Sequence, residues 1–358
     1  MFHNLEDWES CEPHDVVVDW DNPWLLKFAN SSHYSRFKTA LMQLFPGRRP
    51  AVIRNSLYYK YVKSTRGDVS DEYIMGACRR AIALIDEIHT HGFIKGKEWE
   101  VVPPEQDWQV GPPKWYGPVA YGIDENGLLV HHDGMHRMSI AWAIGIPLPM
   151  RIVAHHKLWT PTYNHIVKTG LYDVFPHPEF QGLATVRKNS LTRFAKVLDR
   201  VRRIKPSRVI DFGSCHGLWP ATASSHFPVT VVELSALYSA MTESWLMAVG
   251  AEYGMQTCWR SVTVGSGDVC TAFSVIHHIS KTTDELDEFL AMVVKAKAVI
   301  MENPNNDDML WHKAIRDRHP EPWSYVDHQL RQAGFTTPRV LHVDVVHQNR
   351  QTICYERG

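Results

Sequence analysis

The sequence predicts an α/β protein with two domains, and three observations lead to this. The 358 residues are enough for about two domains with full cores. In the C-terminal half, short apolar runs typical of buried strands alternate with helical patterns, which favours a mostly parallel sheet. In the N-terminal half, short strands and proline-rich turns surround one apolar helix, which predicts a smaller α+β domain.

Composition excludes several classes of protein. The formal net charge is −1, so no global field attracts nucleic acid or an anionic membrane. The six cysteines form no C-x-x-C pair, which argues against a zinc ribbon and for reduced thiols in a cytoplasmic protein. Residues 1–7 lack the apolar core of a signal peptide, and no apolar run approaches the roughly 20 residues of a membrane span. We therefore expect a cytoplasmic protein without a membrane span.

The N-terminal part divides into an irregular extension and a first domain. Residues 1–45 mix tryptophans and prolines with acids and histidines, and we expect them to pack over the domain that follows, 46–160. Within that domain, apolar residues recur at intervals of three and four over 71–90, which predicts one amphipathic helix. Gly92 is placed to end it.

A second run of elements surrounds a short polar motif. Strands are expected at 119–123 and 128–130, joined by the turn 124–127 with Asn-Gly at its centre. An apolar helix, 138–144, and a strand, 150–153, follow. The motif itself, Asp133-Gly134-Met135-His136-Arg137, lies between the second strand and the helix.

This motif is typical of a phosphate site. A glycine that opens a helix leaves backbone N–H groups unpaired, and these can cradle a phosphate. Arg137 would add a charged fork to the same anion, and Asp133 could hold Mg²⁺. An alternative stays open, in which His136 and Arg137 only lock the turn by hydrogen bonds.

The motif resembles the D-G-x-H-R segment of ParB/sulfiredoxin-like domains. The resemblance covers about residues 50–160 and is firmest over 121–159, where His155-His156 also fits. It implies nucleotide or phosphate binding by Asp133, Gly134, His136 and Arg137, with Asp133 catalytic, and a phosphotransferase or ATPase activity that uses ATP and Mg²⁺. The motif does not assign a general base; Glu98 and Glu100 are only candidates.

Residues 161–205 are predicted to be a linker with a basic amphipathic helix. Apolar residues share one face of 191–204, and cations are frequent around it. Most simply these cations form a solvated face. The alternative is a grip on an anionic substrate such as a phosphorylated glycan or nucleic acid. The cations are Arg187, Lys188, Arg193, Lys196, Arg200, Arg202, Arg203 and Lys205.

The C-terminal domain, 206–358, is organised around residues 209–217. A buried strand runs into a turn with two glycines, Gly213 and Gly217, that permit a sharp bend and close approach of a ligand. The next strand, 229–232, ends in Glu233, where an acid can accept hydrogen bonds from both hydroxyls of a ribose. This order of elements predicts a nucleoside-binding half of a Rossmann-type sheet.

The spacing of the glycines indicates which class of nucleotide-like ligand the turn would bind. The turn reads D-x-G-x-x-x-G, not the G-x-G-x-x-G of dinucleotide-binding proteins, and 92–97 has the wrong spacing for a P-loop. The turn resembles the first motif of class I S-adenosylmethionine-dependent methyltransferases, and the resemblance covers 200–358. It implies a seven-stranded sheet with an antiparallel edge, and S-adenosylmethionine as cofactor. The implied binding residues are Asp211, Gly213, Ser214, Gly217, Glu233 and Ser274.

Two features of this domain bear on its chemistry. A third strand is expected within 256–264, where no second acid for the adenine amino group is found. A fourth buried strand is expected over 268–279, with Ser274, His277 and His278 at its carboxyl end, the side on which open α/β sheets bind ligands. His277 or His278 could act as base. Neighbouring side chains on a strand point to opposite faces, so we expect no metal there.

The ending of that strand, S-V-x-H-H-x, resembles methyltransferases fused to sugar-modifying kinases in polysaccharide capping enzymes. The leading hypothesis is therefore a cytoplasmic methyltransferase with an N-terminal nucleotide- or phosphate-handling domain, acting on a sugar or glycan terminus. Glu302 and Asn303, after the fifth strand, could orient the acceptor. Two alternatives remain: a nucleic-acid methyltransferase with a ParB-like binding module, which the near-neutral charge does not favour, and a non-catalytic structural protein with vestigial sites.

Overall fold

A computed structural model describes residues 5–30, 32–44, 50–91, 118–187, 189–273, 275–303, 311–336, 338–344 and 350–357. The contacts group the chain into two compact units. The first comprises Met1–Pro161 and Pro176–Gln181, and the second comprises Thr162–Phe175 and Gly182–Gly358. These groupings differ from the predicted boundaries, because much of the predicted linker 161–205 joins the second unit.

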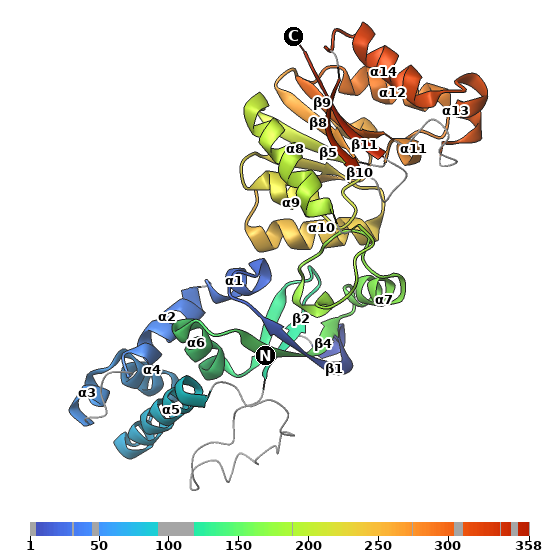
Figure 1. Cartoon of the computed structure of the whole chain (residues 1–358). Coiled ribbons are helices and arrows are strands. Elements are labelled where there is room, and N and C mark those ends of the chain that lie inside the picture. The colour runs from blue at the N-terminus through green and yellow to red at the C-terminus, as the bar shows by residue number, and fades with distance from the viewer. Residues whose placement is uncertain are drawn as a thin grey trace. The chain divides into compact units, whose positions relative to one another are not determined.

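The first unit is built on a four-stranded mixed sheet of order β1-β4-β2-β3 (Figure 1). β1 is antiparallel to β4, β4 is parallel to β2, and β2 is antiparallel to β3. The expected strands at 119–123, 128–130 and 150–153 are all present. The bounds are β1 Trp8–Val18, β2 Val119–Ile123, β3 Leu129–Asp133 and β4 Leu148–His156.

Strand β1 corrects the prediction that residues 1–45 are irregular. It pairs with β4 along an edge of the sheet, and its register shifts between Ser10 and His14. Pro13 lies within this irregularity, one of the few positions where a strand tolerates proline. Because of its charged residues and its proline, this segment lacks the alternating pattern of a strand. Its extended conformation comes from pairing with β4.

The helices of this unit pack on one another around a separate apolar cluster. The amphipathic helix predicted over 71–90 is confirmed as α5, and the apolar helix predicted over 138–144 is present as α6. Residues of α2, α3, α4 and α5 form the cluster, together with Leu44 and with Ile140 of α6. The bounds are η1 Leu5–Asp7, α1 Pro23–Ala29, α2 Ser32–Met42, α3 Pro50–Asn55, α4 Leu57–Arg66, α5 Asp71–His91 and α6 Met135–Ile144.

The second unit contains a seven-stranded sheet of order β10-β11-β9-β8-β5-β6-β7. All neighbours are parallel except β11, which is antiparallel to both β9 and β10. This is the mostly parallel sheet with an antiparallel edge strand pair that the sequence predicted. The bounds are β5 Arg208–Phe212, β6 Val229–Val232, β7 Tyr253–Gln256, β8 Asp268–Ala272, β9 Ala298–Asn303, β10 Arg339–Asp344 and β11 Arg350–Glu356.

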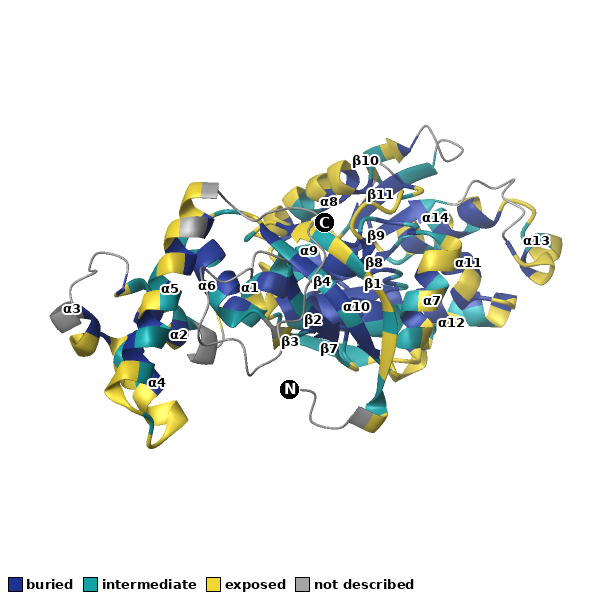
Figure 2. Cartoon of the chain, turned by 90° about the horizontal axis from the view of Figure 1, so that it is seen from below, coloured by how far each residue is buried: buried dark blue, intermediate teal, exposed yellow. Residues whose placement is uncertain are grey.

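Helices cover both faces of this sheet. In Figure 1, α8, α9 and α10 lie on one side, and α12, α13 and α14 on the other. The strands β8 and β9 between them are buried along almost their whole length (Figure 2). The bounds are α7 Thr160–Thr169, η3 Pro178–Phe180, α8 Ser190–Ile204, α9 Leu218–Ser224, α10 Ala236–Val249, η4 Trp259–Ser261, α11 Ile276–Ile279, α12 Thr283–Val293, α13 Lys313–Arg318 and α14 Pro322–Gln332.

Two elements differ from the prediction. The third strand of this unit lies at 253–256, before the expected 256–264, because Trp259–Ser261 forms a 3-10 turn instead. The fourth strand ends at Ala272, and His277 and His278 lie in the short helix α11. Within the described ranges, every helix is too short or too polar to cross a bilayer.

Candidate active site

The glycine turn follows β5 at the point where the order of the second sheet reverses. β5 pairs with β6 on one side and with β8 on the other. After β5 the chain adds β6 and β7 on one side, and then returns to add β8 and the later strands on the other side. In open α/β sheets, ligands bind outside the carboxyl ends of the strands at such a reversal. The turn therefore lies where open α/β sheets bind ligands.

The backbone of the turn is strained. Gly213, Cys215 and Gly217 have φ values of 76°, 52° and 83°. A left-handed conformation costs a non-glycine residue such as Cys215 about 1–3 kcal/mol, and such strain concentrates at functional sites. The surroundings hold it in place: the Cys215 N–H donates to Glu233, and the Cys215 carbonyl accepts from the Thr242 hydroxyl.

The two glycines are required by packing within the protein. A Cβ atom on Gly213 would lie 2.2 Å from Cγ2 of Val275, and one on Gly217 would lie 2.8 Å from Cα of Thr242. The sequence predicts clearance for a ligand at these positions. In the structure, Val275 after β8 lies next to Gly213, and Thr242 of α10 lies next to Gly217.

Glu233 ends β6 and faces this turn. Its carboxylate accepts the N–H groups of Cys215 at 3.1 Å and Ser235 at 2.9 Å, and the Ser214 hydroxyl lies 3.5 Å away. The residue is 7% exposed, and burial raises the pKa of its carboxyl group, while these hydrogen bonds oppose the rise. A carboxylate has about four acceptor positions, so after these three bonds one remains for a hydroxyl donor, and a second becomes available if the Ser214 hydroxyl turns away.

Asp211 lies inside β5. It accepts a hydrogen bond from the Thr271 hydroxyl at 2.7 Å, and Thr271 in turn accepts from the Trp219 indole. Burial raises the pKa of the Asp211 carboxyl group to about 7. Cys215 is half-buried, and desolvation raises the pKa of its thiol, so it is not poised as a nucleophile.

A small polar cavity adjoins Asp211 and Gly213. Its volume is about 30 Å³, roughly the share of one water molecule in the liquid. Tyr172, Asp173 and Phe273 line it alongside the glycine turn. None of these three was expected at the site. Tyr172 and Asp173 lie far from the turn in sequence, and no local pattern marks them.

Arg187 and Arg193 also line this cavity, which corrects their assignment to a solvated face. They are 1% and 2% exposed. Arg187 donates to both carboxylate oxygens of Glu302, at 2.6 and 2.8 Å, and Arg193 donates to the same carboxylate. Burial lowers the pKa of Arg187, but Glu302 outweighs that effect and the pKa stays above its ordinary value. Glu302 therefore holds α8 and the segment before it against β9.

The two candidate bases lie just beyond Val275, the residue that packs on Gly213. His277 is buried, His278 is exposed, and their ring centroids are 4.0 Å apart. Although His278 is exposed, partial desolvation of its ring, assisted by Arg350, lowers the pKa of the imidazole, so it is neutral at pH 7 and can accept a proton. Ser274 lies outside the described residues. In the described part of the chain, no three His, Cys, Asp or Glu side chains are grouped as metal ligands.

The residues of the N-terminal motif belong to the first unit. Gly134 has a φ of 97° and begins α6. Arg137 is 1% exposed and donates to the Pro118 carbonyl, and its guanidinium lies against Gly134. The His136 imidazole is 2.5 Å from the Tyr58 hydroxyl. These contacts match the alternative in which His136 and Arg137 lock the turn. The side chain of Asp133, and all of Glu98 and Glu100, lie outside the described residues.

Comparison with solved structures finds methyltransferases. The methyltransferase domain of bacterial CtHen1 is 16% identical with a TM-score of 0.37, covering 46% of this chain and 97% of that one. The bifunctional kinase-methyltransferase WbdD is 16% identical with a TM-score of 0.41, covering 55% of this chain and 46% of that one. The N-methyltransferase NodS from Bradyrhizobium japonicum is 9% identical with a TM-score of 0.35, covering 47% of this chain and 98% of that one.

No family description and no curated protein matches the sequence. The chain spans about half the length of WbdD. Because these similarities are low, the assignment of the second unit to the class I methyltransferase fold rests on the order and directions of its seven strands.

Proposed function

We propose that the second unit binds S-adenosylmethionine and transfers its methyl group to an acceptor. The observation that supports this most is the bond between Glu233 and the strained Gly213–Gly217 turn. An acid at the end of β6 meets the turn after β5 at the reversal of the sheet, where a ribose would lie.

The chemistry of the donors fits this cofactor. Glu233 would accept the ribose hydroxyls, and the acids Asp211 and Asp173 would face the positively charged amino end. The cavity of about 30 Å³ is too small for an adenosyl group and would hold at most part of the cofactor. S-adenosylmethionine, once bound, supplies an activated methyl group.

Little further chemistry is needed from the protein. Holding the acceptor in line supplies much of the rate. An acceptor oxygen or nitrogen that bears hydrogen must lose one proton overall, and the neutral imidazole of His278 is exposed and able to take it. His277 is buried, which makes it the weaker candidate.

Calorimetric titration with S-adenosylhomocysteine tests the proposal. We expect binding by the unmodified protein and a loss of roughly tenfold or more in Glu233→Gln, which removes one charged acceptor oxygen at the cost of about 1.4 kcal/mol or more. Glu243→Gln is the matched control. It makes the same change on α10, where Glu243 contacts only Tyr253 among described hydrogen bonds, and it should bind normally.

Two results would contradict the proposal: no binding by the unmodified protein, or equal binding by Glu233→Gln. Tight binding without methyl transfer to any acceptor would instead support the structural alternative with vestigial sites. Thermal melting of each variant shows that it is folded.

The finer expectations carry less support. A sugar or glycan terminus as acceptor remains a prediction from sequence. ATP, Mg²⁺ and phosphoryl transfer at Asp133–Arg137 require an arginine open to an anion, whereas Arg137 is buried against Gly134 and Pro118. We therefore confine the proposal to methyl transfer by the second unit.

A further inference from the structure

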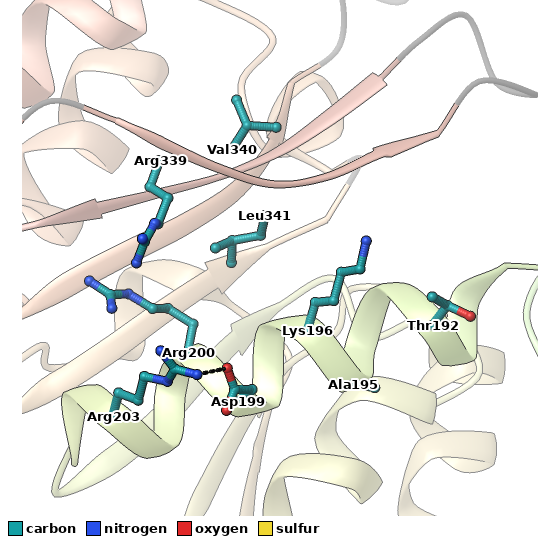
Figure 3. A pocket seen from close by; sticks show the side chains of 9 residues that line it. All are labelled: Thr192, Ala195, Lys196, Asp199, Arg200, Arg203, Arg339, Val340 and Leu341. Atoms are coloured by element: carbon teal, nitrogen blue, oxygen red, sulfur yellow. Dashed lines mark ion pairs between the residues drawn. The ribbon is translucent and has the colours of Figure 1, made fainter.

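A groove runs between α8 and the edge strand β10, on the surface of the second unit (Figure 3). Its volume is about 480 Å³, within the range of ligand sites. It is separate from the cavity at Gly213, since the two share no lining residue. Four cations line it: Lys196, Arg200, Arg203 and Arg339.

The positive charge of the groove is only partly balanced. Arg203 pairs with Asp199 at 2.8 Å, but both side chains are 64% exposed, and such pairs contribute little. Arg200 pairs with Glu356. Among the described residues, neither Lys196 nor Arg339 has an acidic partner within ion-pair distance, and both are exposed. A chain with a net charge of −1 thus gathers cations at one place.

The cations form a row. Lys196, Arg200 and Arg203 are spaced four and three residues apart, which places them on one face of α8 at intervals of roughly 6 and 4.5 Å along the axis. Figure 3 shows the guanidinium groups of Arg339 and Arg200 pointing toward one another from opposite sides of the groove. The pairing of Arg200 with Glu356 offsets part of the repulsion between these two cations, and a bound anion would offset more of it.

Helix stability alone does not explain this arrangement. Cations in the last turn of a helix favour its dipole, which accounts for Arg202 and Arg203. Lys196 lies in the middle of α8, and Arg339 belongs to a strand. Both face the groove from positions that the dipole does not reach.

We propose that this groove binds the sugar-phosphate backbone of a single-stranded nucleic acid. A row of cations along one helix face matches a chain of evenly spaced anions better than one isolated phosphate. No aromatic residue lines it, so bases would not stack there and recognition would be through phosphates, tolerant of sequence. If the proposed methyl transfer also holds, on which this last step rests, nucleic acid becomes the acceptor class.

Fluorescence anisotropy with a labelled single-stranded RNA 20-mer, repeated with DNA of the same sequence, tests the groove without reference to methyl transfer. Four phosphate contacts predict a slope of about −3 in a plot of log K against log salt. The variant Lys196→Glu/Arg339→Glu should bind at least about tenfold more weakly and show roughly half that slope. Melting temperatures check that both proteins are folded.

The matched control is Lys281→Glu/Lys295→Glu. It changes the net charge by the same amount at two exposed lysines that do not line the groove, and it should bind like the unmodified protein. Equal losses in both double variants, or no binding of either oligonucleotide, would overturn the proposal. So would displacement of the RNA by millimolar inorganic phosphate, which indicates a single-anion site, or by a phosphorylated glycan at lower concentration than unlabelled RNA.

Discussion

At the scale of single residues, the candidate site is defined by two buried acids with different partners. Glu233 binds the backbone of the glycine turn, and its place could be predicted because it follows a strand that itself follows the turn. Asp211 was expected beside it as a cofactor ligand. Its partner Thr271 lies 60 residues away on β8, and only the pairing of β5 with β8 brings the two together.

The titration of Asp211 should be visible in the stability of the protein. Its pKa in the folded chain, about 7, lies above the ordinary value of 3.8, so the folded state holds the proton more tightly than the unfolded state. The free energy of unfolding therefore falls as pH rises from about 4 to 7 and is flat above. The Asp211→Asn variant has no carboxyl group at this position, so this fall in unfolding free energy with pH is absent. We expect its unfolding free energy, relative to the unmodified protein, to rise by roughly 2–4 kcal/mol over that window.

Urea unfolding of both proteins at pH 4, 6 and 8 measures this difference. Contributions of other groups cancel between the two proteins. A difference that stays constant with pH would show that Asp211 is not a high-pKa acid.

At the scale of elements, α8 shows how far a local pattern reaches. The expected helix 191–204 differs from α8 by one residue, and its apolar residues Phe194, Val197 and Val201 are buried as the periodicity predicts. The apolar periodicity does not show which cations of this helix are buried and which are exposed. Arg193 turns inward to Glu302, whereas Lys196 lines the exposed groove.

The carboxylate of Glu302 should be essential to the packing of α8 on the sheet. Glu302→Gln leaves Arg187 and Arg193 charged and buried without a counter-charge from this residue, and we expect a loss of about 3–5 kcal/mol in unfolding free energy. Glu288→Gln, which affects only an exposed pair with Arg260, should cost at most about 1 kcal/mol. Chemical denaturation compares the two, and equal losses would mean that the buried pairs are dispensable.

At the scale of the whole molecule, the chain leaves the first unit after Pro161 and returns to it at Pro176–Gln181. The returning segment is held by buried groups. Glu179 accepts from the Trp159 indole at 2.8 Å and pairs with His155, and the His177 ring contacts the Gly127 carbonyl at 2.9 Å. A short stretch distant from the sheet in sequence thus completes its core.

Fragments of the chain test whether Pro176–Gln181 completes the core of the first unit. A fragment of residues 1–181 retains the returning segment, and one of residues 1–175 lacks it. We expect the shorter fragment to melt roughly 5–10 °C lower, because it loses a few kcal/mol of buried contacts. A fragment of residues 1–187 controls for length and should melt like 1–181. Circular dichroism measures the melting temperatures. If fragments 1–175 and 1–181 melt at the same temperature, the segment is not part of the first unit.

The sequence by itself determined the class of fold, the order of the seven strands in the second unit, the glycine turn and the acid after β6. These depend on residues within a few positions of one another, where periodicity and turn chemistry act. Only the tertiary structure decided that Pro13 lies in an edge strand, that Arg187 is buried on Glu302, and that Val275 fills the space beside Gly213. Arg187 and Glu302 are 115 residues apart, and burial depends on such distant partners, which no local pattern identifies.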